Sequence, residues 1–347
     1  MTGNNWAILS PYVIPSELSS KKVNLGDGFI LRGIERQIGT FKTAWIFSSR
    51  RAPKGAEFSA MQAAGTVILG GANQLSDDFT VWPGATGNDI RRNAIRFVPF
   101  GIGLNGTPDR NRGFTENARD VIAAIHERIE FSSWRCGRTV KLLEQAFPEL
   151  AGRFLMTGCP VLYDSPLLES DQFDDREGSV AVTVTERGDF WEREARTLEF
   201  VSKRFRKARK TMVLHQVFGS ISPYETWPVV GGLLGSRARL RNLARKLGFH
   251  ISAPQNADEL IAFYRSTDLH IGSRLHAHLL FLSQNKRSFL IGVDERSVGF
   301  AEFLGFPLVD PLSIEQELGF NFEVVRSNAR KTYTTMRNFL RSLETST

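Results

Sequence analysis

Cysteine is almost absent from the sequence: Cys136 and Cys159 are the only two, and neither belongs to a Cys-x-x-Cys pair. Two isolated cysteines exclude a disulfide framework. No apolar run approaches the roughly 18 residues that a membrane-spanning helix requires. Residues 1–10 lack the basic segment and long apolar core of a secretory signal. We therefore expect a protein of the reducing cytoplasm.

The 347-residue chain also lacks internal repeats and low-complexity tracts, and it is long enough for two domains of roughly 150 residues each. Hydrophobic residues make up 41% and charged residues 23%, as in a packed globular protein and unlike a disordered or fibrous one. The formal net charge is +7. Such an excess is compatible with a phosphate-rich partner, an anionic membrane surface or an acidic substrate.

Short continuous apolar runs alternate with segments of helical period in the first half of the chain. A continuous apolar run is typical of a strand that is buried on both faces. We predict strands at residues 6–9, 44–47, 66–69 and 97–100, and helices at residues 28–38, 115–126 and 139–147. This alternation predicts a mainly parallel sheet that helices cover on both faces.

An acidic stretch without apolar period then interrupts the pattern, and the alternation restarts after it. We predict strands at residues 180–184, 211–214, 250–251, 268–271 and 288–293, and helices at residues 190–207, 237–247, 257–264, 275–283, 298–304 and 327–343. The expected division is an N-terminal domain (1–168), a linker (169–178), a C-terminal domain (179–310) and a helical segment (311–347). The predicted fold class is α/β, with two doubly wound Rossmann-like domains that face a cleft at the carboxyl ends of their strands.

Small-residue turns follow three strands of the first half, at residues 24–28, 70–73 and 101–106. None of them is a dinucleotide fingerprint or a Walker loop. Glycines let a ligand approach the backbone, and a helix start favours an anion. Asp27 is either the N-cap of the following helix or a group that faces the cleft. Three such turns form an open rim that suits a polar, bulky substrate such as a sugar.

The most informative segment runs from residue 268 to residue 280, where a strand ends at Gly272 and a helix follows. We expect Ser273 to cap this helix. Arg274 and His276 in the first turn would form a site for a phosphate or carboxylate, with a histidine that can supply a proton. His270 and His278 are interpreted as buried histidines that satisfy hydrogen bonds.

The positive charge is concentrated in the second half. Residues 187–246 contain 14 Lys and Arg against 5 Asp and Glu, so the remainder of the chain is slightly acidic. The basic residues are concentrated at 203–210 and 237–246. We interpret them either as a solvated helix face or as a surface that contacts anionic lipid head groups. Phe205 is the only aromatic residue inside either run, which argues against a nucleic-acid partner.

Several short motifs together resemble the polysaccharide pyruvyl transferase family. The motifs occur in the expected order and span the chain from about Asn24 to Gly305. They are Asn24-Leu25-Gly26-Asp27, Gly70-Gly71, Gly101-Ile102-Gly103, Thr157-Gly158-Cys159-Pro160, Ser273-Arg274-Leu275-His276-Ala277, residues 288–294 and residues 299–305. The sequence departs from the family pattern at residues 131–135, at Cys159, where the family often has Asp, and after Asp294, where a frequent lysine is missing.

The resemblance implies a fold like the two-domain GT-B glycosyltransferases. It also implies transfer of a pyruvyl group from phosphoenolpyruvate onto two hydroxyls of a sugar in a polysaccharide or lipid-linked glycan, giving a cyclic ketal and phosphate. In the family, the residues that match Arg274, Leu275 and His276 bind phosphoenolpyruvate. A second family arginine corresponds to Arg187, which follows the first strand of the C-terminal domain.

These residues suggest a mechanism in which His276, as imidazolium, protonates the enol methylene, while Asp27 acts as a base or orients the acceptor. Ser273 is expected to help bind the donor. Other residues expected in the cleft or on the acceptor side are Asn24, Gly26, Gly71, Asn73, His215 and Gln216. No cluster has the spacing of metal ligands, so we predict neither a metal nor a cofactor besides the donor substrate. The alternatives are a GT-B glycosyltransferase that uses a nucleotide sugar and a non-catalytic glycan-binding protein.

Overall fold

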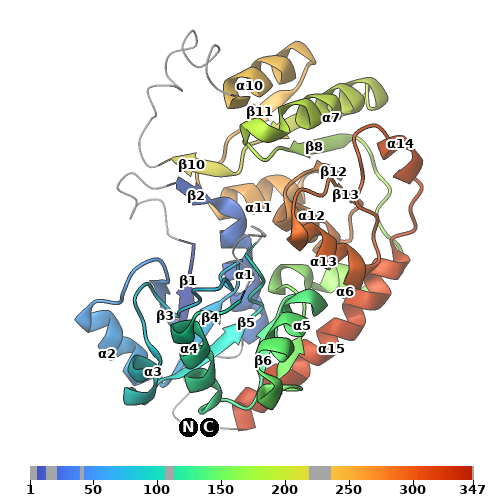
Figure 1. Cartoon of the computed structure of the whole chain (residues 1–347). Helices are drawn as coiled ribbons and strands as arrows, with labels where there is room; N and C mark the ends of the chain where they lie inside the picture. The colour runs from blue at the N-terminus through green and yellow to red at the C-terminus, as the bar shows by residue number, and fades with distance from the viewer. Residues whose placement is uncertain (1–5, 13–21, 40–42, 106–112, 219–235, 346–347) are drawn as a thin grey trace.

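The computed structural model describes residues 6–12, 22–39, 43–105, 113–218 and 236–345. Each half of the chain forms its own parallel sheet, and the two halves lie one above the other in Figure 1. The alternation of apolar runs and helical segments therefore predicted the architecture correctly.

The N-terminal sheet has the order β3-β1-β4-β5, and all its pairings are parallel. Its strands are β1 (Trp6–Ser10), β3 (Thr43–Ser48), β4 (Thr66–Gly70) and β5 (Arg96–Phe100). Every residue of β1 and β4 is buried, as expected for continuous apolar runs inside a covered sheet. A second parallel pair, β6 (Ser132–Trp134) and β7 (Phe154–Met156), joins this half through a bridge between Ile102 and Trp134.

The helices of the N-terminal half are α1 (Leu25–Ile38), α2 (Gly55–Ala64), α3 (Gly87–Arg92), α4 (Glu116–His126), α5 (Gly137–Ala146) and α6 (Ser165–Glu169). The sequence predicted α1, α4 and α5 but not α2, α3 or α6, and residue 169 of the expected linker is the last residue of α6. Met61 is the buried residue of α2, so this helix lacks the broad apolar stripe on which the prediction relied.

The C-terminal sheet has the order β11-β9-β8-β12-β13 and is also parallel. Its strands are β8 (Ser179–Thr183), β9 (Arg209–Val213), β11 (His250–Ser252), β12 (Leu269–Gly272) and β13 (Ser288–Leu290), the last shorter than predicted. Its helices are α7 (Trp191–Arg204), α10 (Ser236–Lys246), α11 (Ala257–Arg265), α12 (Leu275–Ser283) and α13 (Glu295–Leu304). All nine residues of α12 are buried, because this helix lies between the C-terminal sheet and the N-terminal half.

Two contacts that the sequence did not predict join the halves near the cleft. The antiparallel strands β2 (Lys22–Asn24) and β10 (Gln216–Phe218) pair across the halves, so β2 delivers the start of α1 to the C-terminal sheet. Helix α1 then packs against α11 and α12. The Cβ of any larger residue at position 28 would collide with Ala257, so Gly28 permits this close approach.

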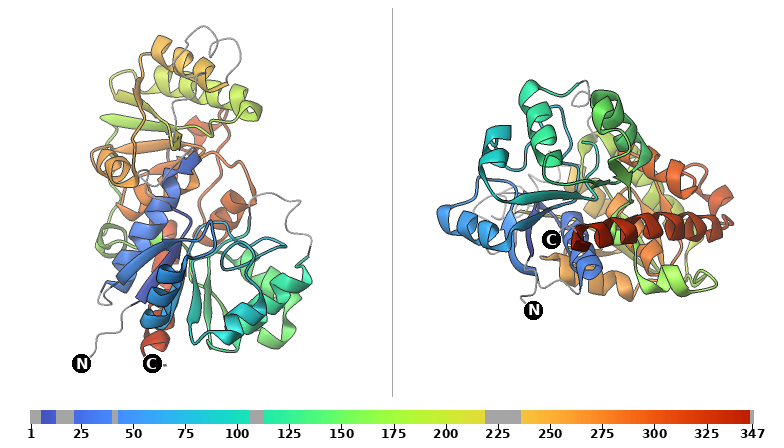
Figure 2. Two further views of the ribbon diagram at one scale, coloured as in Figure 1. Left: turned by 90° about the vertical axis from the view of Figure 1, so that its left-hand side faces the viewer. Right: turned by 90° about the horizontal axis from the view of Figure 1, so that it is seen from below.

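The last helix, α15 (Glu323–Thr345), follows the short α14 (Ile314–Glu317) and runs from the C-terminal half down the side of the N-terminal half (Figures 1 and 2). Its Phe339 packs against Phe100 of β5, and its Thr332 accepts a hydrogen bond from the hydroxyl of Tyr163. Residues 170–178 connect the halves without helix or strand, apart from a bridge between Asp174 and Lys286. None of the helices in the described ranges is both long and apolar enough to cross a bilayer.

Candidate functional site

A pocket of about 250 Å³ opens at the carboxyl ends of the C-terminal strands, and we call it the inner pocket. Its lining comes from the segments that follow β8, β9, β12 and β13, together with the start of α1 from the other half. The lining residues are Asn24, Gly26, Thr185, Arg187, His215, Gln216, Ser273, Arg274, Leu275, His276, Val293, Asp294, Arg296 and Ser297. The first turns of α1, α12 and α13 thus meet at one small pocket.

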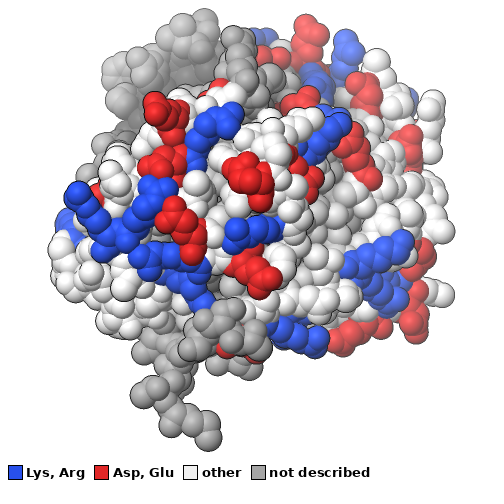
Figure 3. Space-filling view, turned by 60° about the horizontal axis from the view of Figure 1, so that its bottom comes forward, with Lys and Arg blue, Asp and Glu red and all other residues white. Residues whose placement is uncertain are grey.

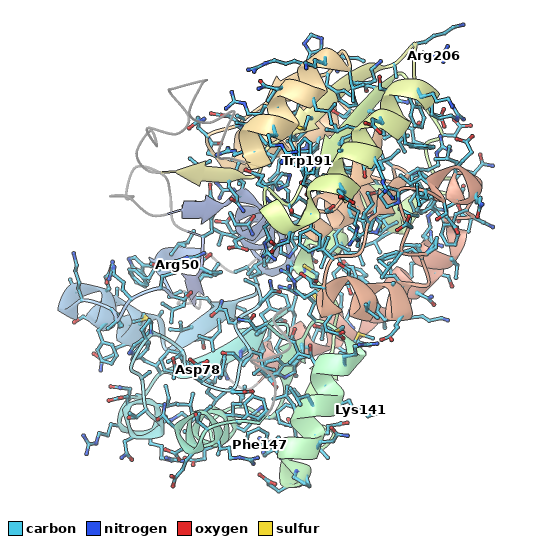
Figure 4. All side chains as sticks on the ribbon, turned by 45° about the horizontal axis from the view of Figure 1, so that its top comes forward. Arg50, Asp78, Lys141, Phe147, Trp191 and Arg206 are labelled. Atoms are coloured by element: carbon cyan, nitrogen blue, oxygen red, sulfur yellow. The ribbon has the colours of Figure 1, made fainter. Side chains whose placement is uncertain are left out.

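A larger pocket of about 870 Å³, the outer pocket, lies mainly on the N-terminal half. The turns after β1, β3, β4 and β5 contribute to it, including Asn73 after β4 and Asn105 after β5. Figure 4 labels two further members of its lining, Arg50 and Asp78. The two pockets share four lining residues, Asn24, Arg187, Asp294 and Arg296, so they form one continuous cleft. The rim predicted from the small-residue turns is therefore present, although Gly71 packs behind it against Ile30.

The first turn of α1 positions an acidic group on the outer pocket. Asn24, and not Asp27, caps the helix by accepting a hydrogen bond from the backbone N–H of Gly26 at 3.3 Å. Asp27 accepts a bond from the Asn24 amide at 3.1 Å and pairs with Arg50 at 3.3 Å. Burial raises the pKa of Asp27, against the opposing effect of Arg50, Arg135 and Arg296. Of the two roles left open for Asp27, the structure excludes the N-cap, and its carboxyl lines the outer pocket.

Arg274 occupies the N-cap position of α12, and Ser273 makes no capping hydrogen bond, contrary to our expectation. The Arg274 guanidinium is fixed on the wall of the inner pocket. Its Nε donates to the carbonyl of Val184 at 2.7 Å, and its Nη2 donates to the carbonyl of Thr185 at 2.9 Å. Its Nη1 makes no hydrogen bond within the described part of the chain, so one edge of the guanidinium can receive an oxyanion.

Glu186 holds Arg274 in place, although no motif of the sequence identified it. Its Oε1 accepts a bond from Arg274 Nη2 at 2.8 Å and one from the backbone N–H of His215 at 2.8 Å. Its Oε2 lies 3.2 Å from Nε of Arg237 at the start of α10. The side chain is 1% exposed, and the residue has a φ of 62°, an unfavourable backbone conformation for glutamate. An ion-pair network thus connects α10 to the inner pocket.

His276 faces the same pocket with an unused nitrogen. Its Nε2 is buried and finds no hydrogen-bond partner among the described residues. The Cβ of any larger residue at position 26 would come within 3.0 Å of its Nδ1, so Gly26 leaves room for the ring. Burial and the charges of Arg135, Arg296 and Arg274 lower the pKa of His276 well below its usual value. Burial in this pocket therefore opposes the imidazolium form that the sequence analysis expected.

Three more guanidinium groups surround the cleft. Arg187 is exposed and lines both pockets, and its side chain makes no ion pair within the ranges that the structure describes. Arg296 lines both pockets as well and pairs with Asp294. Arg135 is fully buried behind the rim, donates to Asn73 at 2.8 Å, and has an Nη2 without a partner in the described chain. Arg135 and Arg296 both lie in segments that depart from the family pattern, so the motifs did not identify them.

Three further histidines, all in the C-terminal half, are buried. His215 lines it and bonds the Tyr264 hydroxyl at 2.6 Å, and burial lowers the pKa of its ring. His270 and His278 each bond Ser288 Oγ at 2.7 Å, which confirms their interpretation as buried hydrogen-bonding groups. His270 also bonds Thr183, whose hydroxyl accepts from the backbone N–H of Arg274. No group of three His, Cys, Asp or Glu in the described ranges could hold a metal ion.

Known proteins match the chain in two ways, through a family model and through the fold of solved structures. A family model described as polysaccharide pyruvyl transferase matches residues 24–295 of the chain. No curated protein matches it. Similar solved structures include a UDP-N-acetylglucosamine 2-epimerase, described as putative, from Listeria monocytogenes, with 11% identity over 100% of this chain and 98% of that one, at a TM-score of 0.54. Another is S. aureus MnaA with UDP, with 8% identity over 99% and 98% of the two chains and a TM-score of 0.51. At these identities the likeness shows the fold alone, which is the GT-B fold.

Proposed function

The chain belongs to the polysaccharide pyruvyl transferase family, and we propose that it moves the pyruvyl group of phosphoenolpyruvate onto two hydroxyls of a sugar. The observation that carries the proposal is the inner pocket, where Arg274, Arg187 and His276 converge at the junction of the two halves. Phosphoenolpyruvate carries a phosphate and a carboxylate, and two arginines on different segments supply the paired charges that such a donor requires.

The reaction balances without a further reactant. One proton joins the methylene carbon of phosphoenolpyruvate, which becomes a methyl group, and C2 becomes electrophilic. One sugar hydroxyl attacks C2, the C2–O bond to phosphate breaks, and the second hydroxyl closes the ketal. The two hydroxyls lose two protons in total. One of them balances the proton on the methyl carbon, and the other leaves with inorganic phosphate.

His276 is proposed to deliver the proton to the methylene carbon. Its pKa is low in the free protein because burial and three guanidinium groups oppose a further positive charge. The donor brings negative charge close to the ring and offsets those guanidinium groups, so its binding raises the pKa of His276. The unpartnered Nε2 can then hold the proton that the reaction needs.

The outer pocket is proposed to hold the acceptor glycan. At about 870 Å³ it is large enough for more than one sugar ring. Side-chain amides, carboxylates and the aromatic residues Phe79 and Trp82 line it. Asp27 lies on its wall, with a pKa raised by burial. A carboxylate of raised pKa is a better proton acceptor than an ordinary one, so Asp27 is proposed to take the proton of an attacking hydroxyl.

We also propose that a basic surface, made of residues 203–210 and 237–246, lies against an anionic membrane that carries a lipid-linked acceptor. Helices α7 and α10 pack together, and Lys203, Arg206 and Lys207 are exposed on this side. Arg206 lies at the outer end of the C-terminal half, away from Arg50 and Asp78 in the cleft (Figure 4). On the opposite end of the molecule, acidic and basic side chains are interspersed (Figure 3).

A phosphate-release assay tests the proposed activity. The full chain is incubated with phosphoenolpyruvate and each member of a panel of synthetic and lipid-linked glycans. We expect release of phosphate that depends on both the donor and one acceptor class, and its loss in Arg274→Ala and His276→Ala variants that retain the folded state. Consumption of a nucleotide sugar in place of phosphoenolpyruvate, or glycan binding without any phosphate release, would contradict the proposal.

A further inference from the structure

The start of α13 forms the wall of the inner pocket that adjoins the first turn of α12. Asp294, Arg296 and Ser297 from this segment line the pocket together with Arg274 and His276. Asp294 caps α13 and accepts hydrogen bonds from the backbone N–H groups of Arg296 and Ser297. These two backbone donors are therefore already satisfied, and the side chains of this wall are the groups to examine for a ligand.

The Ser297 hydroxyl lacks a partner. Ser297 is 1% exposed, it lines the pocket, and its Oγ makes no hydrogen bond within the described residues. A buried hydroxyl is ordinarily hydrogen-bonded, and an exception in a functional pocket indicates where a ligand atom belongs. His276 Nε2 is a second unpartnered atom in the same pocket. The inner pocket is thus lined by two buried polar residues without a partner in the described chain for one of their atoms, Ser297 at the start of α13 and His276 at the start of α12.

The charge beside Ser297 defines the ligand chemistry. The Arg296 guanidinium pairs with Asp294 through Nε and Nη2, and its Nη1 has no bond to any other described residue. A hydroxyl donor next to a guanidinium, at the positive end of a ten-residue helix, suits an oxyanion. A neutral sugar hydroxyl would bind this wall less strongly than an oxyanion, because it carries no charge to pair with the guanidinium.

We propose that Ser297 donates a hydrogen bond to an oxyanion of phosphoenolpyruvate, with Arg296 as the neighbouring charge, so that the donor is held between α12 and α13. This inference rests on the proposed function of the pocket. Ser297 lies beyond the residues that the family model matches, which end at residue 295. Arg274 on α12 and Ser297 on α13 would then bind different ends of the donor, one its phosphate and the other its carboxylate.

The test is a comparison of donor binding by the full chain and two serine variants. Ser297→Ala removes only the hydroxyl. Ser283→Ala is the matched control, because Ser283 is also buried on a helix and bonds its own helix at Leu280. We expect Ser297→Ala to raise the Kd and KM for phosphoenolpyruvate about 10- to 100-fold, with a smaller change in kcat, as loss of a bond to a charged group predicts. Ser283→Ala should leave all three values unchanged.

Two fragments of the donor, inorganic phosphate and pyruvate, then compete with phosphoenolpyruvate in the same titrations. The fragment whose affinity falls in Ser297→Ala identifies which oxyanion the hydroxyl binds. Ser297→Ala that folds and binds phosphoenolpyruvate like the wild type overturns the inference, and so does a loss for phosphoenolpyruvate that neither fragment shares. If Ser297→Ala is unfolded, Ser297→Cys takes its place, with an intermediate loss expected. Failure of the wild type to bind phosphoenolpyruvate would instead overturn the proposed function, and the inference with it.

Discussion

Glu186 accepts a hydrogen bond from Nη2 of Arg274 across 2.8 Å, and these two residues lie 88 positions apart in the sequence. Removing Glu186 would leave Arg274 and Arg237 without their shared carboxylate in a poorly solvated place. Glu186→Gly is the informative variant, because glycine adopts the positive φ of this residue without strain. We expect kcat/KM for phosphoenolpyruvate to fall about 10- to 100-fold, mainly through KM.

The control for this variant is Glu199→Gln, an exposed position on α7. Steady-state kinetics and a thermal unfolding curve on both variants separate the loss of donor binding from loss of the fold. An unchanged KM in a folded Glu186→Gly protein would show that Arg274 does not need its partner.

Arg187 gives a second prediction, because it lines both pockets and makes no ion pair within the described ranges. Arg187→Ala should lower kcat/KM for phosphoenolpyruvate about 10- to 100-fold, as expected for a charge-assisted bond to an anion. The melting temperature should change little, because the side chain is exposed. Arg206→Ala, on the outer basic surface, serves as the control and should behave like the wild type with a water-soluble acceptor. Equal kinetics in the two variants would remove Arg187 from the donor site.

Donor binding should be coupled to proton uptake. Burial and nearby guanidinium groups lower the pKa of His276. On the proposed mechanism, the negative charge of the bound donor raises that pKa again. Calorimetric titration in two buffers of different ionisation enthalpy measures the protons that are bound. We expect more uptake by the wild type than by His276→Gln, and a wild-type affinity that rises as the pH falls from 8 towards about 6, where the phosphate itself begins to titrate. Identical proton counts in the two proteins would contradict the role of His276.

Acid should destabilise the fold from near neutral pH. Five buried histidines have lowered pKa values, among them His126 at about 4 and His270 at about 3, and the others are His215, His276 and His278. The unfolded chain protonates them near pH 6.5, so their stabilising contribution is complete above that pH and is lost as the pH falls towards the folded-state values.

Each of these histidines can contribute a slope of up to about 1.4 kcal/mol per pH unit in that window. The raised pKa values of Asp27 and Glu194 act in the opposite sense, but only two such groups oppose five histidines. Urea unfolding at pH 7.5, 6.5 and 5.5 measures the free energy of unfolding. This free energy should fall slightly between pH 7.5 and 6.5 and more steeply between pH 6.5 and 5.5. A flat profile would refute this account of the histidines.

The basic surface predicts binding to anionic vesicles. An Arg206→Glu/Lys207→Glu double variant changes two exposed residues far from the cleft. Each basic residue near such a surface contributes about 1 kcal/mol, and the two replacements also add repulsion, so vesicle affinity should fall at least tenfold. Cosedimentation with phosphatidylglycerol vesicles measures this loss, while turnover of a water-soluble acceptor should be retained. Equal sedimentation of wild type and variant would indicate a merely solvated helix face.

Much of the fold could be predicted because apolar runs and helical periods are local signals. The buried strands β1, β4 and β8 each stand out as continuous apolar runs, and α12 has the bounds of the helix predicted at residues 275–283. The cap residues were less predictable. Asn24 and Asp27 can both accept a helix N–H, and only the backbone geometry decides that Asn24 does so.

The residues that hold the site residues in position could not be predicted, because their role depends on contacts between segments that are distant in the sequence. Arg274 and His276 stood out through their position after a strand. Glu186, which fixes Arg274, has no local signature, and its role appears only when β8 and β12 become neighbours. The lowered pKa of His276 likewise results from burial and from Arg135 and Arg296, which belong to other segments of the chain.

The most direct test of the proposed activity follows the carbon atoms of the donor. Phosphoenolpyruvate labelled with carbon-13 at C2 is incubated with the protein and the acceptor that supports phosphate release, and the product is analysed by NMR and mass spectrometry. Pyruvyl transfer predicts one labelled ketal carbon, bonded to two sugar oxygens, for each phosphate released. Release of phosphate with the label recovered as free pyruvate, and none in the glycan, would contradict the proposed function.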